Sequence, residues 1–122
     1  MAELKAEGVW NDVVLVVVSD FGRTLNSNGQ GTDHAWGGNY LVMGGGVKGG
    51  QILGDYPSGL GDDSDCNIGN GVLLPTTPWE AMWQPIAEWM GADDAKLDFL
   101  LPNAANFPAN TLISHDEMFA SS

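Results

Sequence analysis

Basic side chains are scarce in this sequence. Its 122 residues include 4 Lys and Arg against 16 Asp and Glu, which gives a formal net charge of -12. Binding to nucleic acid or to an anionic membrane depends on basic groups that contact phosphates. We therefore exclude nucleic acid as a partner and expect a basic protein surface or a divalent cation instead. The acidity is also typical of an ordinary solvated surface.

Cysteine and long apolar runs are equally scarce. Cys66 is the only cysteine, which excludes a disulfide within the chain. The longest apolar run, Val13 to Val18, is far shorter than the roughly 20 residues that cross a bilayer. Residues 1–7 lack the apolar stretch and the cleavage pattern of a signal peptide. We expect a soluble protein without a membrane span, in a compartment that the sequence does not indicate.

The first part of the sequence begins with a helix signal and continues with strand signals. Residues 2–8 are predicted to be the end of a helix, because residues 2–7 are good helix formers and Gly8 can end the helix. Asp12–Ser19 is a β-branched run without alternation, which is typical of a strand buried on both faces of a sheet. A second strand is predicted at Asn39–Met43, before three glycines. Helix followed by buried strand favours a single α/β domain.

The second part of the sequence predicts two helices and a tail. Thr77–Glu80 has the pattern of a capping box with proline at the first helical position, which predicts a helix over residues 78–90. Pro85 interrupts that helix. A shorter helix is predicted over residues 93–100, with its first residue, an aspartate, as the cap. Residues 108–122 are predicted to be an extended tail.

Two features of this part have alternative interpretations. The acidic run Asp62–Asp65 lies in a polar loop and invites a calcium-site hypothesis, but it lacks the spacing of a calcium-binding loop. Trp79, Trp83 and Trp89 are close together on the predicted helix. They could form a platform for a sugar, or they could belong to the core or to a protein interface. We take them as the candidate interface residues.

Several short motifs occur in order along the chain. Ser19–Thr24 reads SDFGRT and Gly31–His34 reads GTDH, and they are followed by Leu41–Gly45 and Val47–Gly50. In combination these motifs resemble a sulfatase-like family of unknown function, whose members carry Ser-Glu-Phe-Gly-Arg-Thr followed by Gly-Thr-Asp-His-Gly. The resemblance covers most of the chain, from Leu4 to Phe107.

This resemblance implies an alkaline-phosphatase-like fold, an α/β fold with a truncated sulfatase-like sheet and flanking helices. Residues 1–107 would be the C-terminal segment of such a module. Enzymes with that fold hold two metal ions with Asp and His at strand ends. By the resemblance Asp20 and His34 are candidate ligands, and Asp33 is either a further ligand or the group that orients the imidazole. Phe21 stands where those enzymes have a histidine and cannot coordinate, so we expect a degenerate metal site.

Carboxylate and imidazole ligands together suit zinc or manganese. We expect either no cofactor or one weakly bound divalent metal ion of this kind. Arg23 is the only arginine, and by the same resemblance it would bind an anionic group of a substrate. A salt bridge to a buried carboxylate is its structural alternative. His115 is expected to be an exposed histidine of the tail rather than a further ligand.

The nucleophile of alkaline-phosphatase-like enzymes lies in a segment upstream of the part that this chain resembles. Neither Ser19 nor Thr24 has a histidine base at a readable spacing, so we predict no catalytic residue in the chain. The expected function is a non-catalytic accessory or structural subunit of a larger assembly, bound to a basic surface. The alternative is a metal-dependent phosphate or sulfate ester hydrolase half-module that another chain completes.

Overall fold

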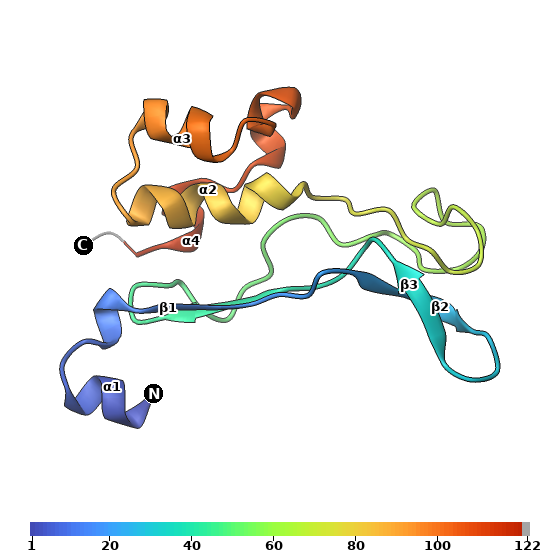
Figure 1. Cartoon of the computed structure of the whole chain (residues 1–122), viewed down its shortest axis with the longest axis horizontal. Helices are drawn as coiled ribbons and strands as arrows, with labels where there is room; N and C mark the ends of the chain where they lie inside the picture. Colours follow the sequence, from blue (N-terminus) through green and yellow to red (C-terminus); the bar gives the residue numbers. More distant parts are fainter. Residues whose placement is uncertain (121–122) are drawn as a thin grey trace. The chain divides into compact units, whose positions relative to one another are not determined.

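The computed structural model describes residues 1–120. They form an α/β fold in which short helices accompany two small sheets (Figure 1). The chain divides into two compact units. The first unit contains Met1–Val16, Val42–Gly54 and the chain from Thr77 onward, and the second contains Val17–Leu41 and Asp55–Thr76.

The apolar run near the N-terminus forms strand β1 (Val14–Val17), which pairs with β4 (Leu41–Gly44) in a two-stranded sheet. Burial alternates along β1, and Leu15 and Val17 remain 50% and 49% exposed. The strand was expected from its β-branched residues, and this is confirmed. The expected burial on both faces is wrong for this chain, because among residues 1–120 the sheet has no third strand and one face of β1 meets solvent.

A β-hairpin dominates the second unit, in a region that the sequence suggests is a polar loop. Strand β2 (Gly22–Ser27) pairs antiparallel with β3 (Thr32–Ala35). The connecting turn has a hydrogen bond from the Asn28 backbone N–H to the carbonyl of Gly31, 2.9 Å long. Gly29 adopts φ +90°, a conformation that other residues rarely adopt. The Asn-Gly pair that permits this turn is the local signal for a hairpin.

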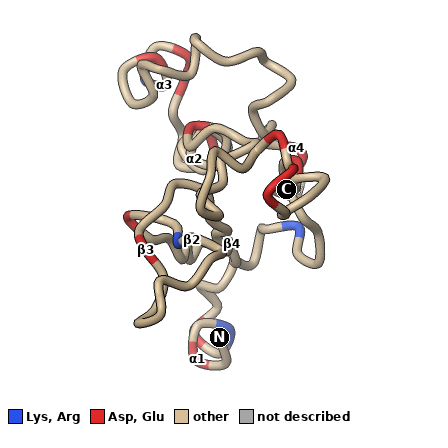
Figure 2. The backbone as a smooth tube through the Cα atoms, turned by 90° about the vertical axis from the view of Figure 1, so that its right-hand side faces the viewer, with Lys and Arg blue, Asp and Glu red and all other residues tan. Residues whose placement is uncertain are grey.

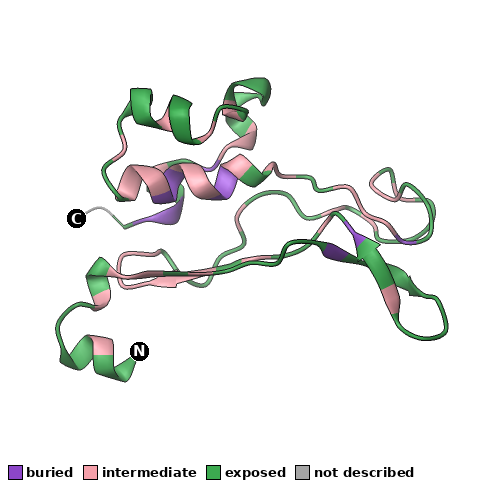
Figure 3. Cartoon of the chain, viewed as in Figure 1, coloured by how far each residue is buried: buried purple, intermediate pink, exposed green. Residues whose placement is uncertain are grey.

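Helix α2 (Trp79–Trp89) supplies most of the core of the first unit. One of its faces packs against the C-terminal part of the chain, and Trp89 stacks on Phe119 with ring centroids 5.8 Å apart. Figure 3 shows the buried residues gathered at this contact. These buried residues are Ala81, Met82, Pro85 and Ile86 of α2, together with Ile113, Met118 and Phe119.

The start of α2 differs from the sequence prediction by one position. The N-cap is Pro78 rather than Thr77, and Pro78 makes no side-chain cap hydrogen bond. Pro78 has extended backbone angles, φ -68° and ψ 155°, so the first helical residue is the next one. The predicted glycine after the helix is confirmed, because Gly91 follows the last turn with φ +89°.

Helix α3 (Asp94–Leu100) begins where the sequence predicts. The Asp93 carboxylate accepts a hydrogen bond from the backbone N–H of Lys96 at 3.1 Å and another from its ammonium at 2.9 Å. The side-chain hydrogen bond from Lys96 is the main cause that lowers the pKa of Asp93. This local capping signal needed no tertiary contact, which is why the sequence predicted it correctly.

Residues 108–120 contain more secondary structure than the extended tail expected for residues 108–122. It contains the 3-10 turn η3 (Ala109–Thr111) and helix α4 (His115–Met118). Ser114 and Glu117 form a complete capping box, and the hydrogen bond from the Ser114 side chain lowers the pKa of Glu117. Residues 121–122 lie outside the described residues. The remaining short elements are α1 (Ala2–Ala6), η1 (Trp10–Asp12) and η2 (Ala104–Asn106).

The C-terminal segment is tied to the loop that follows β4. The Lys48 backbone N–H donates to the carbonyl of Met118 at 2.8 Å, and the Ala120 N–H donates to the carbonyl of Gly46 at 2.9 Å. These two bonds flank a β-bridge between Val47 and Phe119. The segment therefore closes the core of the first unit.

No helix within residues 1–120 combines the length and the apolar content needed to cross a membrane.

Candidate functional site

The β2–β3 hairpin places its side chains on two faces of different character. Gly22, Thr24 and Ala35 are buried on one face. Arg23 and His34 lie directly opposite each other in the ladder and are exposed on the other face. This split follows from the alternation of side chains along a strand. The exposed face is where the polar candidates of the sequence meet.

An open hollow of about 540 Å³ lies beside this hairpin in the second unit. Asp20, just before β2, and His34 of β3 line the same hollow. The sequence placed both at strand ends by resemblance, and the fold brings them to one place. The remaining lining residues are Phe21, Ala35, Trp36 and Pro75.

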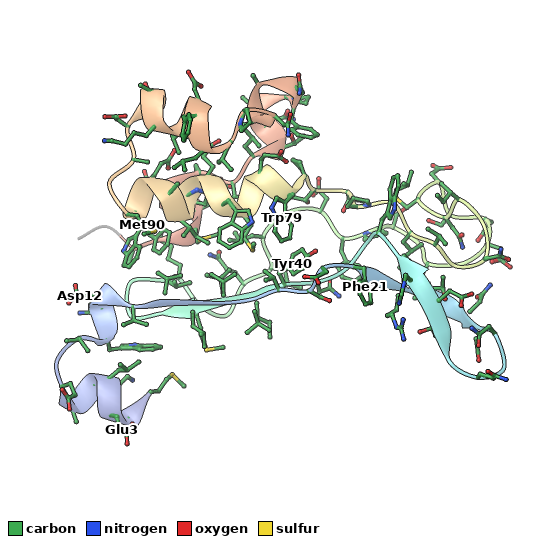
Figure 4. All side chains as sticks on the ribbon, viewed as in Figure 1. Glu3, Asp12, Phe21, Tyr40, Trp79 and Met90 are labelled. Atoms are coloured by element: carbon green, nitrogen blue, oxygen red, sulfur yellow. The ribbon has the colours of Figure 1, made fainter. Side chains whose placement is uncertain are left out.

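Phe21 packs on the imidazole of His34. The two ring centroids are 4.2 Å apart with an angle of 38° between the ring planes. Figure 4 shows Phe21 at the start of β2. Phe21 also meets the Arg23 guanidinium, whose carbon lies 5.8 Å from the ring centroid, within the range of a cation–π contact. The ring therefore holds a histidine and an arginine together.

Asp33 does not join this group. Successive side chains of a strand point to opposite faces, so Asp33 and His34 project to different sides of β3. The Asp33 carboxylate accepts a hydrogen bond from the Asn28 amide at 2.7 Å, and its backbone N–H donates to the Thr24 hydroxyl at 3.0 Å. Asp33 thus stabilises the hairpin and its turn.

The donor set does not fit a resident metal ion. Within residues 1–120 no group of three or more His, Cys, Asp and Glu side chains could hold one. That absence includes the acidic run Asp62–Asp65, for which the sequence raised a calcium hypothesis. Asp20 and His34 offer two donors at most, beside a phenylalanine that cannot coordinate. The residues of the hollow therefore do not support a reaction step through a metal ion.

We expect only weak binding of zinc or manganese to the chain and no hydrolysis of activated aryl phosphate or aryl sulfate esters. Two exposed donors leave most of the coordination sphere to water, and structural and catalytic zinc sites use at least three protein ligands. Calorimetric titration measures the binding, and chromogenic ester assays with added metal measure the turnover. The matched control is the Asp20→Ala, His34→Ala double variant. A tight stoichiometric site that His34→Ala abolishes, or turnover clearly above that control, would contradict this expectation.

Arg23 makes no ion pair with a carboxylate within residues 1–120, whereas Lys96 pairs with Asp93 at 2.9 Å. The described residues therefore do not supply the salt bridge to a buried carboxylate that the sequence left open. Figure 2 shows acidic residues on all the labelled helices and a basic residue on β2. An exposed arginine without a carboxylate is notable in a chain with this excess of acids.

The three candidate interface tryptophans have different surroundings. Trp89 stacks on Phe119 within the core of the first unit. Trp83 is half-buried and packs against Trp79, with ring centroids 5.7 Å apart. Its indole N–H is buried and has no hydrogen-bond partner among residues 1–120. Trp79 is 47% exposed. His115 is half-buried and its ring lies against Phe119, with centroids 5.2 Å apart, so it belongs to the core contact of α4.

The sequence reasoning missed Trp36 as a residue of the hollow. Trp36 is 70% exposed, follows the last residue of β3 directly and lines the same hollow as His34. Recognition of the Asn-Gly turn would have predicted the hairpin, and with it the place of Trp36 directly after β3.

The family comparison covers the hollow and both strands of the hairpin. Residues 1–97 match the model of a family described as protein of unknown function (DUF1501). The chain belongs to the DUF1501 family. No curated protein and no solved structure matches it.

Membership in the DUF1501 family confirms the part of the resemblance that concerns a family of unknown function. The description of that family names neither a sulfatase nor an alkaline phosphatase, so that relationship remains a hypothesis. The matched range contains all the candidate residues around the hollow as well as α1, both sheets and α2. The core residues Met118 and Phe119 lie beyond the matched range.

Proposed function

We propose that this chain is a non-catalytic structural building block of a larger assembly related to sulfatase-like modules. The observation that carries the proposal is the apolar surface on β1. Leu15 and Val17 project from one face of this strand, and each exposes about half of its surface. Contacts with another protein are one of the roles that exposed apolar patches serve, and this is the role we assign to the face of β1.

The pairing of β1 and β4 supports the same proposal. A two-stranded sheet is marginally stable in water unless further strands or helices cover it. Its edges also offer unpaired N–H and C=O groups to an additional strand. Leu41 of β4 is 61% exposed as well. An added strand would pair with an open edge of this sheet, and a partner element packed on the face of β1 would cover Leu15 and Val17.

The charge of the chain indicates what surrounds the apolar contact on the partner. β1 and β4 contain no charged residue, but Asp12 and Asp20 lie just outside β1. The whole chain carries a formal charge of -12. A partner with apolar residues at the centre of its contact surface and basic residues around them would complement both features, and opposite charge would speed their encounter.

The hollow beside the hairpin favours a non-catalytic role. Catalysis by a metal ion requires an ion held in a fixed geometry next to a nucleophile. Here Phe21 occupies one side of the His34 ring and Asp33 is engaged with Asn28. These contacts support the proposal that the hollow lacks the full set of ligands that a metal enzyme needs.

A hydrolase half-module completed by another chain is the second candidate. It is favoured by one observation, the shared hollow of Asp20 and His34. In that case the partner would supply both the nucleophile and the missing ligands. Metal binding and ester hydrolysis that appear only in a reconstituted complex would favour this candidate over the structural one.

Binding of a hydrophobic dye such as anilinonaphthalene sulfonate tests the proposal. We expect the folded chain to raise the fluorescence of the dye, because the face of β1 offers it an apolar surface. The Leu15→Thr, Val17→Thr variant should lose a large part of this signal, since threonine keeps the preference for a strand but adds a hydroxyl.

The matched control changes two apolar residues elsewhere. Ile52 and Phe99 are 81% and 85% exposed and lie outside both sheets, so the Ile52→Ser, Phe99→Ser variant should lose less of the signal. Equal losses in the two variants would mean that the dye does not report on β1. No dye binding by the unmodified chain would contradict the proposal.

A further inference from the structure

The exposed face of the β2–β3 hairpin combines aromatic rings with positively charged or hydrogen-bonding groups. Phe21 and Arg23 are two residues apart, as are His34 and Trp36, and Arg23 and His34 face each other across the ladder. Alternation along the strands places Arg23 and His34 on one side. Phe21 and Trp36 lie just outside the strands and line the hollow together with His34, and Arg23 adjoins the hollow through its contact with the Phe21 ring. None of them belongs to the buried face that holds the hairpin together.

The guanidinium of Arg23, the positive group on this face, can still donate hydrogen bonds to a ligand. The Arg23 guanidinium contacts the Phe21 ring at 5.8 Å from its centroid and makes no ion pair within residues 1–120. Of the three lysines, Lys96 pairs with Asp93, the Lys48 ammonium donates to the carbonyl of Asp116, and Lys5 on α1 makes no ion pair within residues 1–120. A guanidinium that is oriented by an aromatic ring but has no carboxylate is suited to bind an anion in its fork of donors.

The geometry points to a binding site for a sugar ring that carries a carboxylate, that is, for a uronic acid. We propose that Arg23 and His34 donate hydrogen bonds to the carboxylate of the ligand. Trp36 supplies an aromatic wall for the C–H face of the ring, and Asp20 accepts hydrogen bonds from its hydroxyl groups. This binding role is independent of the proposed structural role of β1.

The dimensions of the hollow favour a ring over a small inorganic anion. Its volume of about 540 Å³ lies within the range of about 300–1,000 Å³ that small-molecule sites occupy. The hollow is open, and Trp36 is 70% exposed, so a sugar within a longer chain could enter as easily as a free one. A bare sulfate or phosphate ion would leave Trp36 without a contact.

The charges around the hollow favour a monoanion with hydroxyl groups. Asp20 lines the hollow together with His34, and its carboxylate would repel a dianion such as phosphate. The same carboxylate needs hydrogen-bond donors from a ligand that displaces its water. A neutral sugar could donate hydrogen bonds to Asp20, but it would leave the guanidinium of Arg23 without an anion. The ligand therefore needs both a carboxylate and hydroxyl groups.

Titration with glucuronate, followed by calorimetry and by the NMR signal of the Trp36 indole N–H, tests the site. Assignment of that signal uses the Trp36→Phe variant. We expect saturable binding of glucuronate that shifts the Trp36 signal, and binding of glucose that is weaker by about tenfold or more, because it lacks the charge-assisted hydrogen bonds. Inorganic sulfate, which is a dianion, should bind more weakly than glucuronate and should not move the Trp36 signal.

Two variants and one control separate this site from general attraction of anions. Arg23→Gln should weaken the binding of glucuronate by about tenfold or more. Trp36→Ala should also weaken the binding of glucuronate, but it should not change the weaker binding of sulfate. Lys96→Gln removes an exposed cation far from the hairpin in sequence and should change nothing. Circular dichroism verifies that each variant is folded. The proposal is overturned if glucuronate does not bind, if glucose binds as tightly as glucuronate, or if Arg23→Gln and Lys96→Gln have equal effects.

Discussion

Replacing Phe119 with alanine is expected to lower the free energy of unfolding by about 3–5 kcal/mol, the usual cost of removing a fully buried aromatic side chain. Phe119 is 1% exposed and is among the largest fully buried side chains of the described residues. Its ring stacks with the rings of both Trp89 and His115. The substitution therefore removes both ring contacts and opens a cavity beside α2.

Urea denaturation followed by circular dichroism and by the summed fluorescence of the five tryptophans measures this loss. Phe99→Ala is the matched control, since Phe99 is 85% exposed on α3 and its removal should change the free energy by less than about 0.5 kcal/mol. Equal effects of the two substitutions would show that the end of the chain does not pack on α2 as described.

Gly45→Ala is expected to lower the free energy of unfolding by about 1–3 kcal/mol, the range found for overpacked sites. A Cβ atom at this position would come too close to the side-chain oxygen of Asn11 and would lie 2.6 Å from the carbonyl oxygen of Trp10. The Gly45 backbone N–H donates to that same carbonyl at 3.1 Å. The loop after β4 therefore approaches η1 too closely to hold a side chain.

The control for this effect is another glycine of the same loop. A Cβ atom at Gly49 would meet no other atom within 4 Å, and Gly49 has no positive φ. Gly49→Ala should therefore be neutral or should stabilise the chain by less than about 1 kcal/mol through the unfolded state. Thermal or urea unfolding compares the two variants. A harmless Gly45→Ala would contradict the close contact between the loop and η1.

Local signals predicted several elements correctly from the sequence. The β-branched run gave β1, and Asp93 gave the start of α3 through a hydrogen bond to a residue only three positions away. The burial of β1 was predicted incorrectly. A run of valines indicates which residues prefer a covered strand, but the number of neighbouring strands in this chain depends on pairing between distant segments.

The C-terminal segment illustrates the opposite error. Ser114 and Glu117 have the spacing of a capping box, the same pattern that was recognised at Thr77 and Glu80. The box forms at Ser114, whereas α2 starts after Pro78, which makes no side-chain cap hydrogen bond. Met118 and Phe119 pack on α2 and hold the segment in place. This contact joins distant parts of the chain, so no short sequence pattern predicts it.

The candidate site was predictable in part. The resemblance of the motifs led to Asp20 and His34, which do line one hollow. Asp33 was predicted to be a metal ligand or to orient the imidazole of His34. That prediction ignored the alternation of side chains along a strand, because the segment that forms β3 was expected to be a loop. Trp36 was missed for the same reason.

The central claim is that the face of β1 in this chain is covered by another protein in its assembly, and light scattering at increasing salt tests it most directly. Salt screens the repulsion that the charge of -12 creates between copies, so the exposed face should then be free to associate. We expect the average mass to rise with salt and protein concentration above that of the 12.9 kDa monomer. The Leu15→Thr, Val17→Thr variant should remain closer to that mass. A chain that stays monomeric under all these conditions and binds no hydrophobic dye would contradict the account.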